Sequence, residues 1–435
     1  MAKKRAPSRT AAKPESIHAQ VASNPDDLLL AAAQRGSDSL ETGRYLVTFR
    51  EGDADAGIKA LKDESFRIAD AREFKGQAIT PEACGDAEAM VLPEIGVALV
   101  GGDSLEAHGF ATAAESDTPE AVESIDPEYF AFAEGSEFLR GFLSAANTIA
   151  RDLGLPPGES PEGEPEAEVL GVTWGLNACR VPPSRFSGAR IKVAILDTGF
   201  DLRHPDFAGR SITAQSFVGQ PVQDLNGHGT HCTGTACGPK APAGSTPRYG
   251  IGFNARIFIG KVLTNSGGGT SATVLSGMNW AIANRCEVIS MSLGAQTGVQ
   301  PAYTAAGNAA LRHNLLIIAA AGNAASSTGA PANSPSIMAV ASLDPSLAPS
   351  SFSNHGKIEI AAPGRDVFSS WPMPTRYRTI SGTSMACPHV AGCAALHAES
   401  NSSYRGMNLW RRLQATARRL PYPASRVGAG LVQAP

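Results

Sequence analysis

Four polar side chains in this chain of 435 residues are of the kinds that carry out acyl transfer: Asp197, His228, Asn323 and Ser384. Ser384 follows Gly-Thr and opens a run of small and apolar residues that predicts a helix. A hydroxyl at a helix N-terminus lies beside unpaired backbone N–H groups and the positive end of the helix dipole, where negative charge is stabilised. The position therefore suits a nucleophile, although a single serine there is more often only an N-cap.

Asp197 and Asn323 each stand at the end of an apolar segment. Asp197 follows residues 193–196, and Asn323 follows residues 317–321 and a glycine. Functional side chains of a parallel α/β sheet gather at the carboxyl ends of its strands. A buried carboxylate there needs a partner such as an imidazole, and an amide can donate a hydrogen bond to an oxyanion. Taken singly, each residue is more often a cap or a turn.

Two histidines compete for the role of general base. His228 and His231 both lie in the segment 226–232, and glycines flank His228 on both sides. Glycine allows the backbone to bring the imidazole ring close to other groups. We favour His228 because it lies at the transition from loop to helix, as Ser384 does. His231 and His389 are expected to be structural.

Together, these residues follow the chain order acid, base and nucleophile that is found in subtilisins. Residues 174–433 resemble a subtilisin-family serine peptidase. The resemblance is carried by Asp197-Thr198-Gly199, His204-Pro205-Asp206, His228-Gly229-Thr230-His231, Ala321-Gly322-Asn323, Gly382-Thr383-Ser384-Met385-Ala386 and Pro388-His389-Val390-Ala391-Gly392.

The resemblance implies a role for each of the four residues. Ser384 would be the nucleophile, and His228 would be its general base and later the general acid. Asp197 would hold the imidazole in the correct tautomer and stabilise the imidazolium ion. Asn323 would bind the oxyanion together with the backbone N–H of Ser384.

The family resemblance also implies how a polypeptide substrate is bound. Two segments resemble the edges between which a substrate strand is held by backbone hydrogen bonds: Gly267, Gly268 and Gly269, and Ser292, Leu293 and Gly294. Gly329 matches the floor of the primary specificity pocket, where a glycine leaves room for a large apolar side chain.

No cofactor is expected to be required, and no metal site is assigned. The seven cysteines form no C-x-x-C pair, so a zinc site and a disulfide scaffold are not expected. Cys232 resembles the free thiol of the proteinase K branch, which implies sensitivity to mercurials. Asp206 matches one ligand of the family's strong calcium site, but residues 238–245 contain no carboxylate or Asn. That calcium site therefore looks incomplete.

The order of the segments divides the chain into four parts. Residues 1–38 are polar and predict disorder. Residues 39–153 predict a ferredoxin-like domain, with strands at 45–49, 66–71, 88–100 and 121–132, helices at 53–64 and 105–115, and a further helix at 136–153. Residues 154–170 predict a Pro/Gly/Glu-rich linker. Residues 171–435 alternate between strands and helices, which predicts an α/β fold with a mostly parallel sheet covered by helices on both faces.

The charges of the chain are divided unequally. Residues 1–170 hold 32 acidic and 15 basic side chains, a net charge of −17, whereas residues 171–435 hold 9 and 22, a net charge of +13. Opposite charges favour docking. In position and fold order, residues 39–153 resemble the inhibitory prosegment of subtilisins. We therefore expect a zymogen that processes itself, with the prosegment as partner and the Glu-rich linker as the site of release.

Location and partners are predicted from what the sequence lacks. No apolar stretch follows the basic residues near the N-terminus, and no run reaches transmembrane length, so we expect a cytoplasmic monomer that binds no membrane. Export by a non-classical route is the alternative. Arg411, Arg412, Arg418 and Arg419 are expected to be a solvated helix face rather than a nucleic-acid site.

Two other functions remain open: a processing peptidase for one intracellular precursor, and a catalytically silent peptide-binding module.

Overall fold

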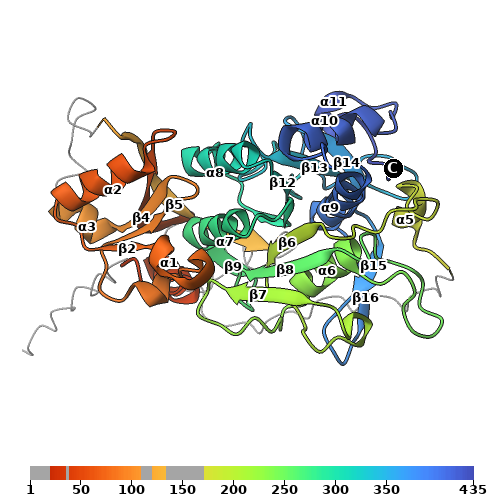
Figure 1. Cartoon of the computed structure of the whole chain (residues 1–435), viewed down its shortest axis with the longest axis horizontal. Helices are drawn as coiled ribbons and strands as arrows, with labels where there is room; N and C mark the ends of the chain where they lie inside the picture. The colour runs from red at the N-terminus through yellow and green to blue at the C-terminus, as the bar shows by residue number, and fades with distance from the viewer. Residues whose placement is uncertain (1–19, 36–38, 109–119, 134–170) are drawn as a thin grey trace, which may run out of the picture.

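The computed structural model describes residues 20–35, 39–108, 120–133 and 171–435. Figure 1 shows a smaller N-terminal domain, in red and orange, beside a larger domain in yellow, green and blue. The predicted helix at 136–153 and the predicted linker at 154–170 lie outside the described residues. None of the described helices is long and apolar enough to cross a membrane.

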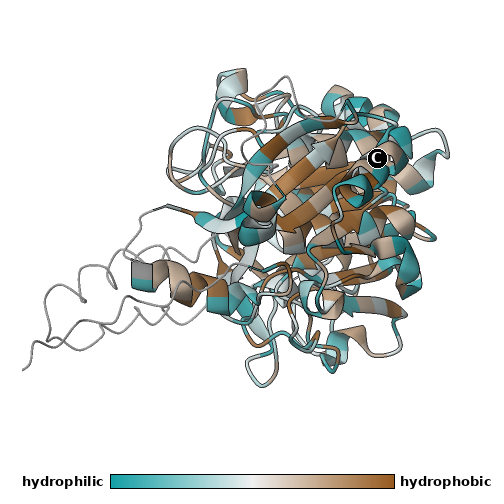
Figure 2. Cartoon of the chain, turned by 90° about the vertical axis from the view of Figure 1, so that its left-hand side faces the viewer, coloured by the Kyte–Doolittle hydropathy of each residue, from teal (hydrophilic) through white to brown (hydrophobic). Residues whose placement is uncertain are grey.

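The larger domain is organised around a seven-stranded sheet in which all neighbouring strands are parallel. Apart from the partly exposed edge strand β7 (Ile212–Ser216), its strands are rich in Val, Ile and Ala and almost wholly buried, as expected when helices cover both faces. Figure 2 shows these apolar strands in brown inside the molecule. In sheet order they are β14 (Ile360–Pro363), β13 (Met338–Leu343), β12 (Leu316–Ala320), β10 (Val288–Met291), β6 (Lys192–Asp197), β8 (Arg256–Lys261) and β7 (Ile212–Ser216).

The helices of this domain pack on the sheet, and two of them begin at its functional end. Helix α6 (His228–Cys237) packs against α9 (Thr383–Ser400), whose first sixteen residues are buried. A Thr270–Thr273 capping box starts α7 (Ser271–Ala283), and a proline at the first position starts α8. The other elements are α5 (Trp174–Ala178), α8 (Pro301–Arg312), α10 (Gly406–Thr416), α11 (Ala424–Val427), the hairpin β15 (Val367–Ser370) and β16 (Tyr377–Ile380), and the short strands β9 (Gly268–Thr270) and β11 (Leu293–Gly294).

The N-terminal domain has the ferredoxin-like sheet order β5-β1-β4-β3, in which these neighbouring strands are antiparallel. The short strand β2 adds an outer edge to this sheet by pairing in parallel with β3. The elements are α1 (Pro25–Arg35), β1 (Glu41–Phe49), α2 (Ala54–Asp63), β2 (Ile68–Asp70), β3 (Ala89–Leu92), β4 (Val97–Gly101), α3 (Gly102–Ala107) and β5 (Val122–Ala133).

Four expectations for individual elements were wrong. Residues 25–35, inside the segment expected to be disordered, form α1 because Leu28, Ala31 and Ala32 are buried against the rest of the chain. The strand expected at 88–100 is two strands, since Pro93 and Gly96 make a turn between them. The second ferredoxin strand is therefore β3, and the segment expected in that place is the edge strand β2. Helix α3 begins at Gly102 and ends at Ala107, while residues 109–119 lie outside the described part.

Strand β5 continues past its own domain and joins the two sheets. Its last residues pair antiparallel with β9 on one side and with β11 on the other. The sheet of the N-terminal domain thus extends into the larger domain, at the two segments predicted to hold a substrate.

Candidate active site

The three predicted catalytic side chains begin or end elements that meet at one end of the parallel sheet. Asp197 is the last residue of β6, His228 is the first residue of α6, and Ser384 is the second residue of α9. The carboxyl ends of parallel strands are where such sheets place their functional groups. Gly382 is the N-cap of α9, so Ser384 lies within the first turn and is not the capping residue.

Asp197 and His228 form a buried pair. The Asp197 Oδ1 atom lies 2.8 Å from His228 Nδ1, and the two side chains are 1% and 9% exposed. Burial disfavours the imidazolium ion, but the charge and the hydrogen bond of Asp197 outweigh it and hold the pKa of His228 well above its ordinary value. Gly227 precedes the ring with φ = +105°, and a Cβ there would lie 2.3 Å from the Trp371 ring. Only glycine therefore fits at this close approach.

Ser384 and Asn323 meet at the start of α9. The Ser384 hydroxyl donates to the carbonyl oxygen of Ser292 at 3.2 Å, and the Ser292 hydroxyl donates to the Ser384 carbonyl oxygen at 2.8 Å. Asn323 Oδ1 accepts hydrogen bonds from the backbone N–H and the hydroxyl of Thr383. These bonds fix the amide so that its Nδ2 lies beside Gly382. An amide donor beside Gly382, which is two residues before Ser384, suits the predicted oxyanion role.

Asp224 is a buried residue of this site that sequence reasoning missed. Its Oδ1 accepts from the Thr198 hydroxyl and from the backbone N–H groups of Asn226 and Gly227, at 2.8–3.0 Å. Its Oδ2 accepts from the N–H and the hydroxyl of Thr230, at 2.9 and 2.7 Å. One carboxylate thus joins the residue after Asp197 to the first turn that carries His228. A carboxylate four residues before a helix start is the signal that could have found it.

Lys261 provides the positive charge beside these carboxylates. It is the β8 partner of Asp197 in the sheet register, and it is fully buried. Its ammonium donates to the Thr198 carbonyl oxygen and to Asn265 Oδ1. Burial lowers the pKa of Lys261 to about 8, although Asp224 and Asp197 oppose that shift.

The two other histidines named in the sequence serve backbone structure. His231 is fully buried, and its Nε2 lies 3.0 and 3.1 Å from the carbonyl oxygens of Val367 and Arg378 in the β15–β16 hairpin. Burial lowers its pKa to about 3. His389 Nδ1 lies 2.8 Å from the Met385 carbonyl oxygen, and burial lowers its pKa to about 4. Neither ring pairs with Asp197, so His228 is the base candidate that the geometry favours.

The predicted substrate segments form the strands β9 and β11, which contain Gly268 and Gly269, and Leu293 and Gly294. Gly267 and Ser292 directly precede them, and the Gly267 carbonyl oxygen accepts from the N–H of Ala133 at 2.8 Å. Gly329 is buried, and a Cβ there would lie 2.5 Å from the Ala295 carbonyl oxygen. The close approach of the two backbones therefore requires glycine.

Cys232 lies against the catalytic pair. Its sulfur is 3.9 Å from His228 Nδ1 and 3.6 Å from the Ser384 carbonyl oxygen, and the side chain is fully buried. Burial raises the pKa of the thiol, so it stays protonated and is a poor nucleophile. The ligand atoms of Asp197, His228 and Cys232 lie within 4.8 Å of one another. A soft thiophilic ion bound there would engage the catalytic base, which supports the expected sensitivity to mercurials.

Asp206, the single match to a calcium ligand, is occupied by other groups. Its oxygens accept from the hydroxyls of Tyr249 and Tyr377 and from the Arg376 guanidinium, at 2.6–3.1 Å. The guanidinium already neutralises the carboxylate, so these residues do not fit a calcium ion at this position.

A buried Asp–His pair and a helix-borne serine at the carboxyl end of a parallel sheet define the class of serine hydrolases with a catalytic triad. The family model described as "Subtilase family" matches residues 188–430. The chain is 38% identical over 253 residues to subtilisin DY of Bacillus licheniformis, covering 56% of this chain and 90% of that protein. It is 38% identical over 272 residues to subtilisin Savinase of Lederbergia lenta, covering 60% and 97%.

A third relative, an alkaline protease of Alkalihalobacillus alcalophilus, is 38% identical over 284 residues, which are 62% of this chain and 72% of that protein. The chain belongs to the subtilase family, and it is a serine endopeptidase.

Proposed function

We propose that this chain is the precursor of a serine endopeptidase that cuts itself and is then held inactive by its own N-terminal domain. In this account Ser384 is the nucleophile, His228 the general base, Asp197 the group that orients it and Asn323 the oxyanion donor. The geometry of the buried Asp–His pair and of the amide beside Gly382 supports these roles.

One observation carries the zymogen proposal: residues 130–133 of β5 lie as an antiparallel strand between β9 and β11. Phe130, Ala131 and Phe132 pair with β9, while Phe132 and Ala133 pair with β11. A substrate bound by strand addition would form the same backbone pairs. The chain's own strand therefore occupies the place of a substrate, and it must leave before another polypeptide can bind.

The register of β5 also suggests where the chain is cut. Ala133, the last described residue of β5, pairs with Leu293, and Leu293 directly follows Ser292, whose carbonyl oxygen accepts a hydrogen bond from the Ser384 hydroxyl. We therefore place the first cut after residue 134, and not in the linker at 154–170. Ala131 and Ala133 are 3% and 4% exposed and belong to the main buried cluster, which includes residues of both domains. This predicts substrates with small side chains at the second and fourth residues before the cut bond.

Labelling with a fluorophosphonate tests the catalytic roles. We expect the processed wild-type protein to be labelled at Ser384 and to hydrolyse casein, and Ser384→Ala to do neither. In Asp197→Ala the probe should react with Ser384 at least about a thousandfold more slowly, because His228 loses its orienting carboxylate. Stable, folded protein that never reacts with the probe would instead indicate a silent peptide-binding module.

A further inference from the structure

Helix α1 lies outside the ferredoxin-like domain proper, yet it packs against residues 130–133 of β5, the strand that lies between β9 and β11. It precedes β1 in the chain and contacts β1 and β9, and Figure 1 shows it beside β9. It therefore lies at the boundary between the two domains, next to the proposed inhibitory strand.

The two faces of the inhibitory strand have different neighbours. Side chains alternate along a strand, and Ala131 and Ala133 join the main buried cluster, which includes residues of both domains. Phe130 and Phe132 face the other way and form a separate cluster with Leu28 and Ala32 of α1. Both phenylalanines are almost fully buried, at 2% and 5% exposure. Helix α1 thus covers the outward face of the strand.

The first turn of α1 is also attached directly to the larger domain. Asp26 Oδ1 accepts hydrogen bonds from the hydroxyls of Thr264 and Ser266, each at 3.0 Å, and Oδ2 accepts from Gln220 Nε2 at 3.1 Å. Thr264 is fully buried, and Gln220 is itself held by the backbone N–H of Asn265. Three converging donors, all from the larger domain, make a site for one carboxylate.

The positive charge for this site comes from Lys261, in the strand that leads into the loop of Thr264 and Ser266. Its ammonium donates to the side chain of Asn265, in the same loop. Burial lowers the pKa of Lys261, and Asp26 is one of three carboxylates that oppose this. The site is thus complementary in charge as well as in hydrogen bonding to an acidic side chain.

We propose that Gln220, Thr264 and Ser266 form a carboxylate-binding site beside the start of β9, that Asp26 fills it in the precursor, and that α1 thereby clamps the inhibitory strand from its outer face. This inference rests on the proposed function, since the strand is taken to inhibit the peptidase. After the cut, the strand cannot leave until α1 detaches. The lifetime of this clamp then sets the delay between cutting and activity.

The test follows two events in the full chain: the cut, by gel and mass, and the appearance of activity on a chromogenic peptide. Asp26→Asn keeps the size of the side chain but removes its charge. We expect it to shorten the delay between the two events about fivefold, because hydrogen bonds to a charged group are the stronger ones. The matched control is Asp27→Asn, the same change at the exposed neighbouring position, which should leave the delay unchanged.

A second pair of variants tests the apolar contact. Leu28→Ala should shorten the delay, whereas Leu30→Ala, at a position that is 59% exposed, should not. The clamp is overturned if Asp26→Asn and Leu28→Ala keep the wild-type delay. It is equally overturned if the two controls shorten the delay as much.

Hydrogen exchange in the inactive Ser384→Ala chain provides a readout without activity. Adding Asp26→Asn should increase amide exchange in residues 130–133, and adding Asp27→Asn should not. If Asp26→Asn increases exchange in this way but no chain that keeps Ser384 ever develops activity, the proposed function fails and the clamp stands. If exchange in 130–133 is unchanged by Asp26→Asn, the clamp is wrong even when the enzyme matures normally.

Discussion

At the scale of single residues, Asp224 is the group that connects the acid and the base of the site. Its five hydrogen bonds join Thr198, next to Asp197, to the turn that carries His228. In Asp224→Asn the amide cannot accept all five. We predict that kcat of the matured enzyme falls by roughly 10- to 100-fold with KM nearly unchanged, because a charged buried hydrogen-bond acceptor is lost.

The control for this variant is Asp206→Asn, which alters another buried carboxylate, one held by Tyr249, Tyr377 and Arg376. It should lower the melting temperature without lowering kcat. A change confined to KM in Asp224→Asn, or an equal loss of kcat in both variants, would show that Asp224 does not position the triad.

The pH dependence of activity follows from the environment of His228. Its pKa is raised because Asp197 stabilises the imidazolium ion more than burial destabilises it. The general base must be neutral, so activity is lost as pH falls through this raised pKa. We predict that the acid limb of kcat/KM in the matured enzyme has its midpoint above pH 6.5. A midpoint clearly below that value would contradict the described Asp–His pair.

At the scale of elements, the N-terminus of α7 in the larger domain contacts a buried carboxylate of the N-terminal domain. Glu128 of β5 accepts a hydrogen bond from the N–H of Ala272 in the first turn of α7, and it pairs with Arg44 at 2.6 Å. Both side chains of the pair are fully buried. We predict that Glu128→Gln destabilises the uncut Ser384→Ala chain by about 3 kcal/mol, because it leaves the Arg44 charge unpaired. Denaturant unfolding measures this loss.

The double change Arg44→Met with Glu128→Gln is the control, since it removes the unpaired charge as well. We expect it to cost less than Glu128→Gln alone. If the double variant is less stable than Glu128→Gln alone, the isolated buried charge of Arg44 is not the cause of the lost stability.

The elements that could be predicted from the sequence are those in which the pattern of apolar residues within the element itself indicates a strand or a helix. The buried run before Asp197 and the small apolar residues of α9 indicate a parallel strand and a central helix without knowledge of their partners. Helix α1 could not be predicted in this way, because Leu28 is buried by Phe130 and Phe132, a hundred residues away. The helix-start position of Asp224 is a local signal, but its link to the Asp197 side of the site is not, because that hydrogen bond goes to Thr198, 26 residues away in the chain.

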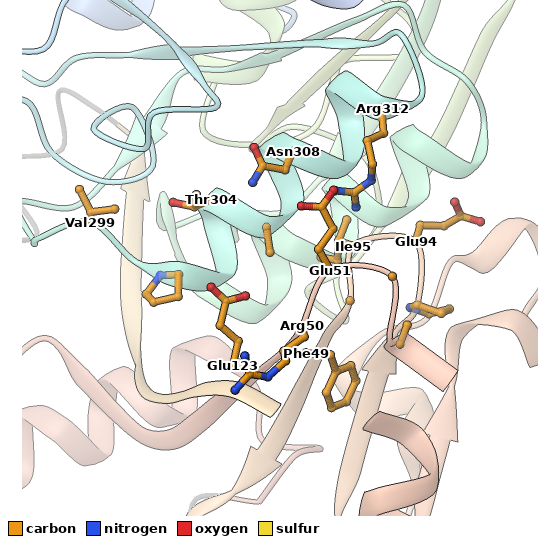
Figure 3. A pocket seen from close by; sticks show the side chains of 16 residues that line it. Phe49, Arg50, Glu51, Glu94, Ile95, Glu123, Val299, Thr304, Asn308 and Arg312 are labelled. Atoms are coloured by element: carbon orange, nitrogen blue, oxygen red, sulfur yellow. The ribbon is translucent and has the colours of Figure 1, made fainter. Parts of the chain in front are cut away.

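At the scale of the whole molecule, the two parts of the chain carry large opposite net charges, but few ion pairs between the described residues join the two domains. Among the described residues, the ion pair that joins the two domains is Glu51–Arg312 at 2.6 Å. Glu94 also lies 3.5 Å from His313, but burial lowers the pKa of His313, so this contact is not an ion pair at neutral pH. Figure 3 shows Glu51 and Arg312 pointing toward one another across a cleft of about 520 Å³ between the domains. The Glu51–Arg312 pair is about half exposed, and such pairs contribute little.

Salt should therefore have a moderate effect on release of the N-terminal domain. Raising the salt concentration from 0.1 to 1 M shortens the screening length from about 10 to about 3 Å. We predict that the delay between cutting and activity shortens by about two- to fivefold over this range, and that Arg312→Gln reduces the effect. A delay that is independent of salt would rule out electrostatic docking, while leaving the contacts of β5 unaffected.

The central claim is that Ser384 cuts its own chain one residue after the end of β5. Exact mass measurement of the purified wild-type and Ser384→Ala chains tests it most directly. We predict that the wild-type chain yields an N-terminal fragment that ends at residue 134 and that Ser384→Ala, purified alone, stays intact. A Ser384→Ala chain cut at the same bond, or a wild-type chain cut only within residues 154–170, would contradict the account.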